Sequence, residues 1–340
     1  MAQNRITSAE VALRAGVSRS AVSRVFTVGA SASKQTVEKV RLAAEELGYR
    51  PNILARAMVS GHSRMIGLVV AYLDNQFYPE TLEKLSNALQ EKGYHVLVFM
   101  AGKDSQSIDG VIEEILDYQV DGIIAASVAL SSDLATRCRT AGVPMVLFNR
   151  DQDDPLMSSV TSDNIAGGRK VAELFLASGH KRIGYISGWE GASTQRDREA
   201  GFVARLSEAG RVLYARETGD FRMDTAREAA LKMFSTDPPD AVFVANDHMA
   251  ISVMDTLRHE LGIKVPEDVS VVGYDDVPAI AWPAYDLTTV RQRSNIMVAK
   301  TVDILLTEIE EDGVQPRKVE IDGPLILRGS AKIPNDWQSE

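Results

Sequence analysis

The sequence predicts a small all-α head, a short hinge helix and a larger α/β body of two lobes, and three observations support this. The charge is distributed unevenly along the chain. Residues 1–60 hold nine Lys or Arg and four Asp or Glu, a net charge of +5. Because the whole 340-residue chain carries −10, residues 61–340 carry −15. The first 50 residues contain three short amphipathic helix patterns. From Met65 onward, apolar strand-like runs alternate with helical segments of about ten to fifteen residues, the pattern of parallel sheets covered by helices.

The overall composition is that of an ordinary globular protein, with 45% hydrophobic and 25% charged residues. The N-terminal residues MAQNR are polar and no apolar run follows them, so we expect no secretory signal. No apolar run reaches the roughly 18 residues that span a bilayer. The single cysteine, Cys138, excludes an internal disulfide. We therefore expect a cytoplasmic protein with no membrane partner.

The first helix of the head is expected to begin after Thr7. Thr7 and Glu10 have the spacing of a capping box, in which each residue's side chain satisfies the other's backbone N–H. Gly16 is expected to end this helix. Its apolar positions are Val11, Ala12 and Ala15.

Two further helices are expected, the first capped by Ser18 and the second capped by Ser33 and closed by Gly48. Their expected inward-facing residues are Ala21, Val22 and Val25, and then Val37, Val40, Leu42, Ala44 and Leu47. Three short helices joined by tight turns form a helix-turn-helix pattern. In that motif the N-terminal residues of the second helix face base edges in the major groove of DNA.

By this geometry Arg19 and Ser20 point at bases, and an arginine can pair bidentately with guanine. Arg24, Ser23 and the cap of the first helix would contact phosphates. The DNA-contacting residues expected in the head are Thr7, Ser18, Arg19, Ser20, Ser23 and Arg24. The alternative is a small helical domain that binds protein and whose arginines are merely solvated.

The segments ITSAEVALRAGVSRSAVSRVF and TVEKVRLAAEELGYRPNILARAM resemble the head of the LacI-type (lactose and purine repressor) family of bacterial transcription regulators. The resemblance is dense over residues 5–60 and most specific in VS..AVSRV and ELGYRPN. The chain departs from the family between the second and third helices, where TVGASAS stands in place of an Asn-Gly type turn. The resemblance implies a double-stranded DNA operator as partner.

A hinge is expected over residues 50–63. In the segment YRPNILARAM, Pro51 and Asn52 suit the first turn of a helix, but a helix this short is marginal in isolation. The resemblance implies that it is the family's hinge helix, with Met58 as the apolar wedge in the minor groove. Ala55 would allow close approach and Arg56 would reach a phosphate. The alternative is a plain linker.

In sheets of the type expected for the body, ligands bind at the carboxyl ends of the strands. Polar residues follow four such strands: Asp74, Asn75, Asn149, Arg150, Asn246, Asp247, Asp275 and Asp276. Asp, Asn and Arg together suit vicinal hydroxyl groups. Asp247 precedes a helix and is interpreted as its cap. Aromatic residues that either line such a site or belong to the core are Phe77, Tyr78, Trp189, Phe221 and Trp282.

The body also resembles the same family, in SDNIAGGRKVAELFLASGHKRIGYISG, RDREAGF, VFVANDHMAI and VPEDVSVVGYDDV. This resemblance implies two periplasmic-binding-protein-like lobes with an effector bound between them. Arg196, Asn246 and Asp275 match the family's polar effector contacts, and Phe221 matches an aromatic platform. Asn149 stands where the family often has Asp, and Ser294 where it often has an aromatic residue. The expected effector-binding residues are Asp74, Phe77, Asn149, Arg196, Phe221, Asn246 and Asp275.

The expected boundaries follow from these assignments. They are 1–49 for the head, 50–63 for the hinge, 64–332 for the effector-binding and dimerisation domain, and 333–340 for a tail. Within the body, lobe one is expected at about 64–161 and 292–320, and lobe two at about 162–290 and 321–332.

The function expected is that of a homodimeric repressor that binds a palindromic operator and is controlled by a small effector, most simply a sugar or sugar derivative. A nucleobase or nucleoside is the rival effector, and a solute-binding receptor the rival class. An enzyme is not expected, since the sequence has no G-x-S-x-G, P-loop, G-x-G-x-x-G or H-E-x-x-H motif. The five histidines show no paired ligand spacing, so neither a metal nor a cofactor is predicted. Whether the effector induces or co-represses is left open.

Overall fold

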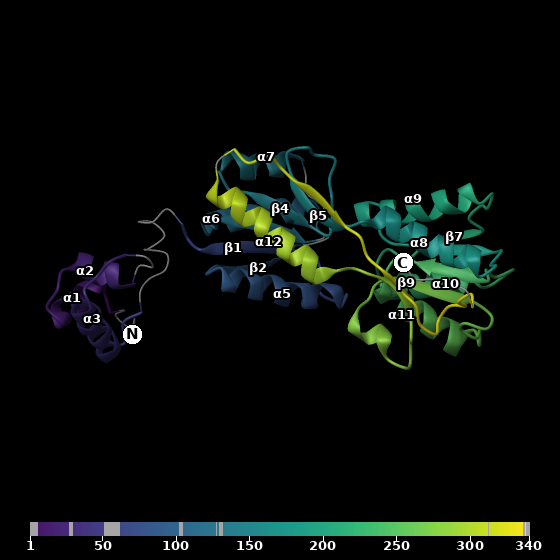
Figure 1. The fold of residues 1–340 in the computed structure, drawn as a ribbon, viewed down its shortest axis with the longest axis horizontal. Helices are drawn as coiled ribbons and strands as arrows, with labels where there is room; N and C mark the ends of the chain where they lie inside the picture. The colour runs from purple at the N-terminus through teal and green to yellow at the C-terminus, as the bar shows by residue number, and fades with distance from the viewer. Residues whose placement is uncertain are drawn as a thin grey trace. The chain divides into compact units, whose positions relative to one another are not determined.

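The computed structural model describes residues 6–26, 30–50, 62–101, 105–126, 128, 132–311, 313–335 and 337. The chain divides into two compact units, Met1–Arg64 and Met65–Glu340, and each is described by itself (Figure 1). Most of the expected hinge lies outside the described residues, and with it the predicted DNA contacts Asn52, Ala55, Arg56 and Met58.

The first unit contains three helices, α1 (Ser8–Ala15), α2 (Arg19–Phe26) and α3 (Lys34–Leu47). The predicted capping box is confirmed: the Thr7 backbone N–H donates to Glu10 Oε2 at 2.7 Å, and the Glu10 N–H donates to Thr7 Oγ1 at 3.4 Å. Gly16 and Gly48 end α1 and α3 with a φ of 66° each, the left-handed conformation that favours glycine.

The core of this unit is formed by one fully buried valine from each helix, Val11, Val22 and Val40. The prediction that Leu42 faces inward is wrong, because its side chain is 58% exposed. The inward positions of α3 are Val40, Ala43, Ala44 and Leu47. They follow the helical spacing of three and four residues, and Leu42 is out of phase with it.

The first lobe of the body is a six-stranded parallel sheet in the order β11-β5-β4-β3-β1-β2. Its strands are β1 (Met65–Val70), β2 (His95–Met100), β3 (Gly122–Ala126), β4 (Met145–Phe148), β5 (Ser158–Ser162) and β11 (Lys318–Ile321). Helices cover both faces (Figure 1): α5 (Phe77–Glu91) and α12 (Ser294–Glu310) on one, α6 (Ser105–Asp117) and α7 (Ser132–Thr140) on the other.

The second lobe is another six-stranded sheet, in the order β12-β10-β9-β8-β6-β7, parallel except where β12 pairs with β10. Its strands are β6 (Ile183–Ser187), β7 (Ala215–Thr218), β8 (Ala241–Val244), β9 (Ser270–Asp275), β10 (Thr288–Arg291) and β12 (Leu325–Ile326). Its helices are α8 (Asn164–Ala177), α9 (Ser193–Glu208), α10 (Met223–Met233) and α11 (Asp247–Asp255), with a π-helical turn η1 (Thr256–Glu260) and a 3₁₀ turn η2 (Pro278–Ala281).

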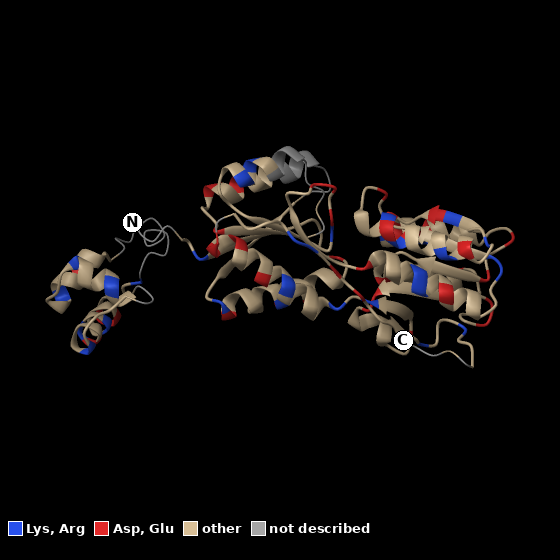
Figure 2. Ribbon diagram, turned by 45° about the horizontal axis from the view of Figure 1, so that its top comes forward, with Lys and Arg blue, Asp and Glu red and all other residues tan. Residues whose placement is uncertain are grey.

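In both lobes the strands of the sheet are mainly apolar, and helices pack against the sheet. The strands β1, β3, β4, β5, β6 and β8 contain no Asp, Glu, Lys or Arg, and charged residues lie mainly on the helices and connections (Figure 2). Strands without charge suit a sheet covered on both faces. No helix in the described part of the chain has the length and apolar character needed to cross a membrane.

The described backbone passes between the two lobes in three places: from β5 to α8, from β10 to α12 and from β11 to β12. Each lobe is therefore built from separate parts of the chain. The carboxyl ends of strands from both lobes contribute to the same junction, since Asn75, beyond β1, donates from Nδ2 to Asp275 Oδ2 at the end of β9 at 3.5 Å.

Candidate functional site

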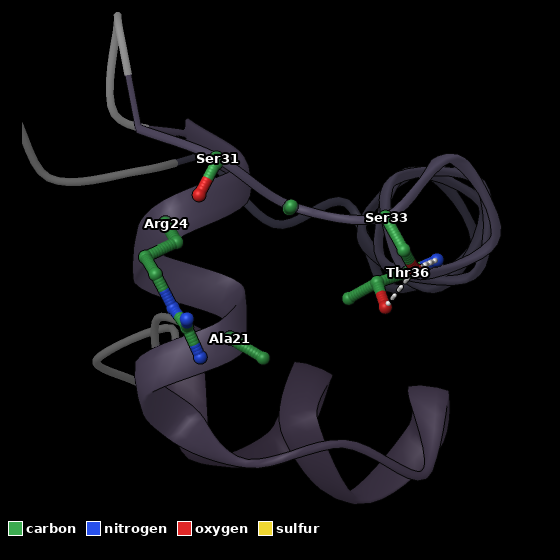
Figure 3. Close-up of a pocket in the computed structure, with 6 residues that line it drawn as sticks. Ala21, Arg24, Ser31, Ser33 and Thr36 are labelled. Carbon is green, nitrogen blue, oxygen red and sulfur yellow. Dashed lines mark hydrogen bonds between the residues drawn. The ribbon is translucent and has the colours of Figure 1, made fainter.

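One candidate site is the exposed face of α2 and the start of α3 in the first unit. Ser18 caps α2, and its Oγ accepts from the Ala21 N–H at 3.2 Å and lies 2.8 Å from Ser20 Oγ. A pocket of about 300 Å³ opens between the two helices, with Arg24 on one side and Ser33 and Thr36 on the other (Figure 3). It is lined by Ala21, Arg24, Ser31, Ala32, Ser33 and Thr36.

This face carries positive charge that no described carboxylate neutralises. Arg14 pairs with Glu46 at 2.6 Å, but neither Arg19 nor Arg24 forms an ion pair with a described residue. The first turns of α2 and α3 contain no acidic residue. Arg24 Nε donates to the Ser20 carbonyl at 3.4 Å, and guanidinium groups without an acidic partner beside helix N-termini suit phosphate oxygens.

A second candidate site is a group of buried polar side chains where the two lobes meet, here called the interlobe cluster. Every member is at most 5% exposed. The first lobe supplies residues that follow β1 and β4, and the second lobe supplies residues from the ends of β9 and β10 and from α9. The members are Asn75, Asn149, Arg150, Arg198, Asp275 and Gln292.

Asp275 is the centre of the cluster. Its Oδ1 accepts from Gln292 Nε2 at 2.7 Å and lies 3.5 Å from Arg198 Nη2. Its Oδ2 accepts from Asn75 Nδ2 of the other lobe at 3.5 Å. Burial raises the pKa of Asp275 above its ordinary value, and the charge of Arg198 partly offsets this rise.

Arg198 is held rigidly on α9. Its Nε donates to Asn164 Oδ1 at 2.9 Å, its Nη1 donates to the Ala245 carbonyl at 2.6 Å, and its guanidinium carbon lies 3.6 Å from the centre of the Tyr274 ring. These contacts leave Nη2 facing Asp275. Arg198 therefore fixes the carboxylate of Asp275 in place.

Several atoms of the cluster have no hydrogen-bond partner. In the described part of the chain, five buried side-chain nitrogen or oxygen atoms form no hydrogen bond. Four of them belong to the cluster: Asn149 Oδ1, Arg150 Nε and Nη1, and Gln292 Oε1. The fifth is His180 Nε2. Buried polar groups in proteins are nearly always paired. The cluster can thus bind a small polar molecule that supplies the missing partners.

The backbone at this junction is also unusual. Asn149 and Asp275 of the cluster have φ values of 56° and 126°, and Phe221, beyond β7, has 56°, all outside the region that side chains other than glycine favour. Such conformations cost free energy and gather at functional sites.

Comparisons with known proteins agree with this two-part organisation. Residues 7–52 match the family described as bacterial regulatory proteins, lacI family, and residues 172–331 match the periplasmic binding protein-like domain. A transcriptional regulator CelR in complex with cellobiose is 30% identical, with a TM-score of 0.73, and the match covers 96% of this chain and all of that one. The chain belongs to the lacI family.

Other lacI-family proteins match over almost the whole chain. The HTH-type transcriptional repressor PurR of Photobacterium profundum is 28% identical, and the ribose operon repressor of Escherichia coli K12 is 29% identical, over 97% and 96% of this chain and 99% of each relative. The Lac repressor dimer bound to operator and the anti-inducer ONPF has a TM-score of 0.87 at 27% identity, over 96% of this chain and 99% of that one. As a member of this family, the chain is a DNA-binding transcription regulator.

The structure does not bring Arg196 into the interlobe cluster. Its side chain is 56% exposed and pairs with the neighbouring Asp197 at 2.8 Å. The arginine that α9 places in the cluster is Arg198, two positions further along. The arginine that the segment RDREAGF contributes to the cluster is thus Arg198 and not Arg196.

The remaining predicted effector residues fall into different surroundings. Asn149 and Asp275 lie in the cluster. The Asp74 side chain is 65% exposed and lies 3.9 Å from His248 Nε2 across the junction. Phe77 is buried and stacks on Phe148 at 6.4 Å, so it belongs to the core of the first lobe.

Two predicted residues of the second lobe are buried near the ends of strands. Phe221 packs against Gly188, where an added Cβ would come within 2.2 Å of its ring. Asn246 is the N-cap of α11, and its Oδ1 accepts from the Met249 N–H at 3.0 Å. Its amide oxygen is thus already engaged by the backbone.

The interpretation of Asp247 as a helix cap is wrong, because Asn246 holds that position. Asp247 is fully buried and accepts from Thr289 Oγ1 at 2.7 Å and from the Val277 N–H at 3.0 Å. Burial, together with the charge of Asp275, raises the pKa of Asp247 to about 7. Asp247 therefore links α11 to β10 beneath the cluster.

Four members of the cluster are not among the expected effector-binding residues, and two of these four are named in the sequence analysis only as strand-end residues. Asn75 and Arg150 were in the strand-end set, but nothing in the sequence distinguished them from their neighbours. Gln292 gave no signal. Arg198 had one, since it shares a helical face with Gly201 and Phe202, three and four residues later, which are both buried.

Proposed function

We propose that this lacI-family protein is a repressor that binds a palindromic operator as a homodimer and is controlled by a sugar or sugar derivative bound at the interlobe cluster. The observation that carries the proposal is the set of unpartnered buried atoms of Asn149, Arg150 and Gln292 at the junction of the lobes. A small polar molecule placed there would supply the missing hydrogen bonds. Because its targets are chromosomal sites, the protein would act in the bacterial cytoplasm.

A homodimer is proposed because one helix-turn-helix head reads only one half-site. Two heads related by a two-fold axis read both halves of a palindrome and gain specificity. The Lac repressor similar to this chain is a dimer bound to its operator. In the head, Arg19 would contact base edges and Arg24, beside the pocket at the start of α3, would contact phosphate.

A sugar is favoured over other effectors by the chemistry of the cluster. Carboxylate and amide oxygens accept hydrogen bonds from hydroxyl groups, and guanidinium groups donate to them. Among similar proteins are the ribose operon repressor and a regulator in complex with cellobiose. A nucleobase is the second candidate, supported by the buried aromatic ring of Phe221.

The effector controls DNA binding only if it prefers one arrangement of the lobes, and the free energy of coupling is reciprocal. The three connections between the lobes provide the physical route, because a change in lobe arrangement moves all of them together.

The test begins by selecting duplexes that bind the full chain from a random DNA pool. We expect a palindromic site. Changing Arg19 to Ala should weaken binding to it by about 1–3 kcal/mol and relax the preference at one position of each half-site. The affinity for the selected site is then measured with sugars, sugar acids and nucleosides.

We expect compounds of the sugar classes to change that affinity. Binding without sequence preference would refute the assignment of the head. A response to nucleosides alone would favour the second candidate effector.

A further inference from the structure

Arg150 has surroundings that differ from those of the other buried arginine at the junction. It follows β4, is 5% exposed, and has neither Nε nor Nη1 in a hydrogen bond. Arg198 is equally buried, but its Nε and Nη1 both donate to oxygen atoms and its Nη2 faces Asp275. Only Arg198 has its charge compensated within the described protein.

No nearby described carboxylate is available to Arg150. Asp275 is engaged by Arg198, Gln292 and Asn75. Asp151, the next residue in the chain, accepts from Ser159 Oγ at 2.8 Å and pairs with Lys318 at 3.0 Å. A buried cation with neither a carboxylate nor a hydrogen-bond acceptor at these nitrogens costs several kcal/mol. Such a cost is typical of a site that a ligand completes.

The groups around Arg150 define the rest of the ligand. The Trp189 ring of the second lobe lies 5.2 Å from the guanidinium carbon, so both lobes face the arginine. The free Oδ1 of Asn149 and Oε1 of Gln292 are acceptors and require donors such as hydroxyl groups.

We propose that the effector is an anionic sugar derivative and that Arg150 binds its acidic group. The guanidinium forms two parallel hydrogen bonds to a carboxylate or a phosphate, and both groups fit this geometry. The hydroxyl groups of the sugar donate to Asn149 and Gln292. The inference rests on the proposed function of the interlobe cluster, and it adds that the effector is charged.

The experiment compares acids with their neutral parents on the full chain. The pairs are D-gluconate with D-glucose for a carboxylate and D-ribose 5-phosphate with D-ribose for a phosphate, and acetate and inorganic phosphate serve as minimal anions, all at one ionic strength. The variants are Arg150→Met and, as matched control, Arg182→Met. Arg182 is 47% exposed and lies at the amino end of β6, whereas the cluster lies at the carboxyl ends of the strands.

The readout is the midpoint of thermal unfolding, which a ligand raises by mass action. We expect at least one anion to raise the midpoint of the wild type and of Arg182→Met more than its neutral counterpart does. Titration should show at least about tenfold weaker binding of that anion to Arg150→Met, the size of effect expected for a charged hydrogen bond. The arm that responds identifies carboxylate or phosphate.

A structural role for Arg150 makes a different prediction. If Arg150 binds a ligand, Arg150→Met without ligand should unfold at the same temperature as the wild type or higher, because an unpaired buried charge has been removed. A lower midpoint combined with an unchanged anion response would overturn the proposal. Equal anion-induced rises of the midpoint in wild type and Arg150→Met, for every anion, would also overturn it, as would tighter binding of the neutral sugars.

Measuring operator affinity in the same samples separates this inference from the proposed function. If an anion binds through Arg150 without changing operator affinity, the proposed control of the operator fails, and only the assignment of Arg150 as an anion-binding residue stands. If a neutral sugar changes operator affinity equally in wild type and Arg150→Met, the proposed function stands and the inference fails.

Discussion

Arg196 and Arg198 lie two positions apart on α9 and have opposite surroundings. Two residues rotate a helix by roughly 200°, so one side chain faces solvent when the other faces the lobe interior. Among the described residues Arg196 pairs with its neighbour Asp197, whereas Arg198 contacts Asn164, Ala245 and Asp275. Residue type and motif alone do not show which of the two arginines is buried. The helical spacing does, because Gly201 and Phe202, three and four residues after Arg198, are buried on the same face of α9.

The two arginines should therefore respond differently to substitution. Changing Arg198 to Met leaves Asp275 without its cation and Asn164 without its donor, and we expect a loss of about 3–5 kcal/mol in the free energy of unfolding. Changing Arg196 to Met should cost less than about 1 kcal/mol, as for other exposed pairs. Urea unfolding measures both.

The same pair of variants reports on effector control. Arg196→Met should keep the response of operator binding to the effector, and Arg198→Met should lose it. If both variants lost equal unfolding free energy, or if operator binding by Arg196→Met no longer responded to the effector, Arg196 would belong to the effector site.

At the scale of elements, the sequence predicts best where local chemistry decides. Buried apolar runs such as β1 and β8 and the capping box at Thr7 depend on neighbouring residues and were predictable. The strand β5 was not, because its sequence SSVTS is polar although every residue is buried. Its hydroxyl groups find partners such as Asp151 and Glu308, and the latter lies 150 positions away. Only the tertiary fold reveals those contacts.

The packing of α8 against α9 links an element to the site. A Cβ at Gly201 would lie 2.1 Å from the Ile165 carbonyl oxygen, and one at Gly168 would lie 2.1 Å from that of Arg198. Both helices approach backbone to backbone because these positions lack side chains. The position of Arg198 beside Asp275 depends on that approach.

Changing Gly201 to Ala should separate the helices. We expect it to lower the free energy of unfolding by about 1–3 kcal/mol, as overpacking does, and to weaken effector binding because Arg198 moves with α9. The control is Ala204→Ser on the exposed side of the same helix. Chemical unfolding and effector titration measure the two effects. A destabilised variant with unchanged effector affinity would show that the position of Arg198 does not depend on this packing.

The whole molecule consists of a basic head and an acidic body. The head carries a net +5 over residues 1–60 and the remainder −15, and the two units are separately compact. The sequence indicated this division through charge and periodicity. It could not indicate which side chains meet at the junction of the lobes, because Asn75 and Asp275 are brought together by the fold across 200 positions.

If the two units are coupled as proposed, their affinities must obey linkage. The factor by which saturating effector changes the operator dissociation constant must equal the factor by which operator changes the effector dissociation constant. Couplings of this kind are typically about 1–3 kcal/mol, or roughly 5- to 150-fold. Isothermal titration of effector into the full chain, with and without operator, measures one factor, and operator binding with and without effector measures the other.

The body alone provides the reference state. A fragment of residues 65–340 contains both lobes and the complete interlobe cluster but lacks the head. We expect it to bind effector with the affinity of the operator-free full chain and to have no measurable operator affinity. If its effector affinity instead matched that of the operator-bound chain, the head would hold the body in one arrangement without DNA. The coupling would then originate within the protein rather than from the operator.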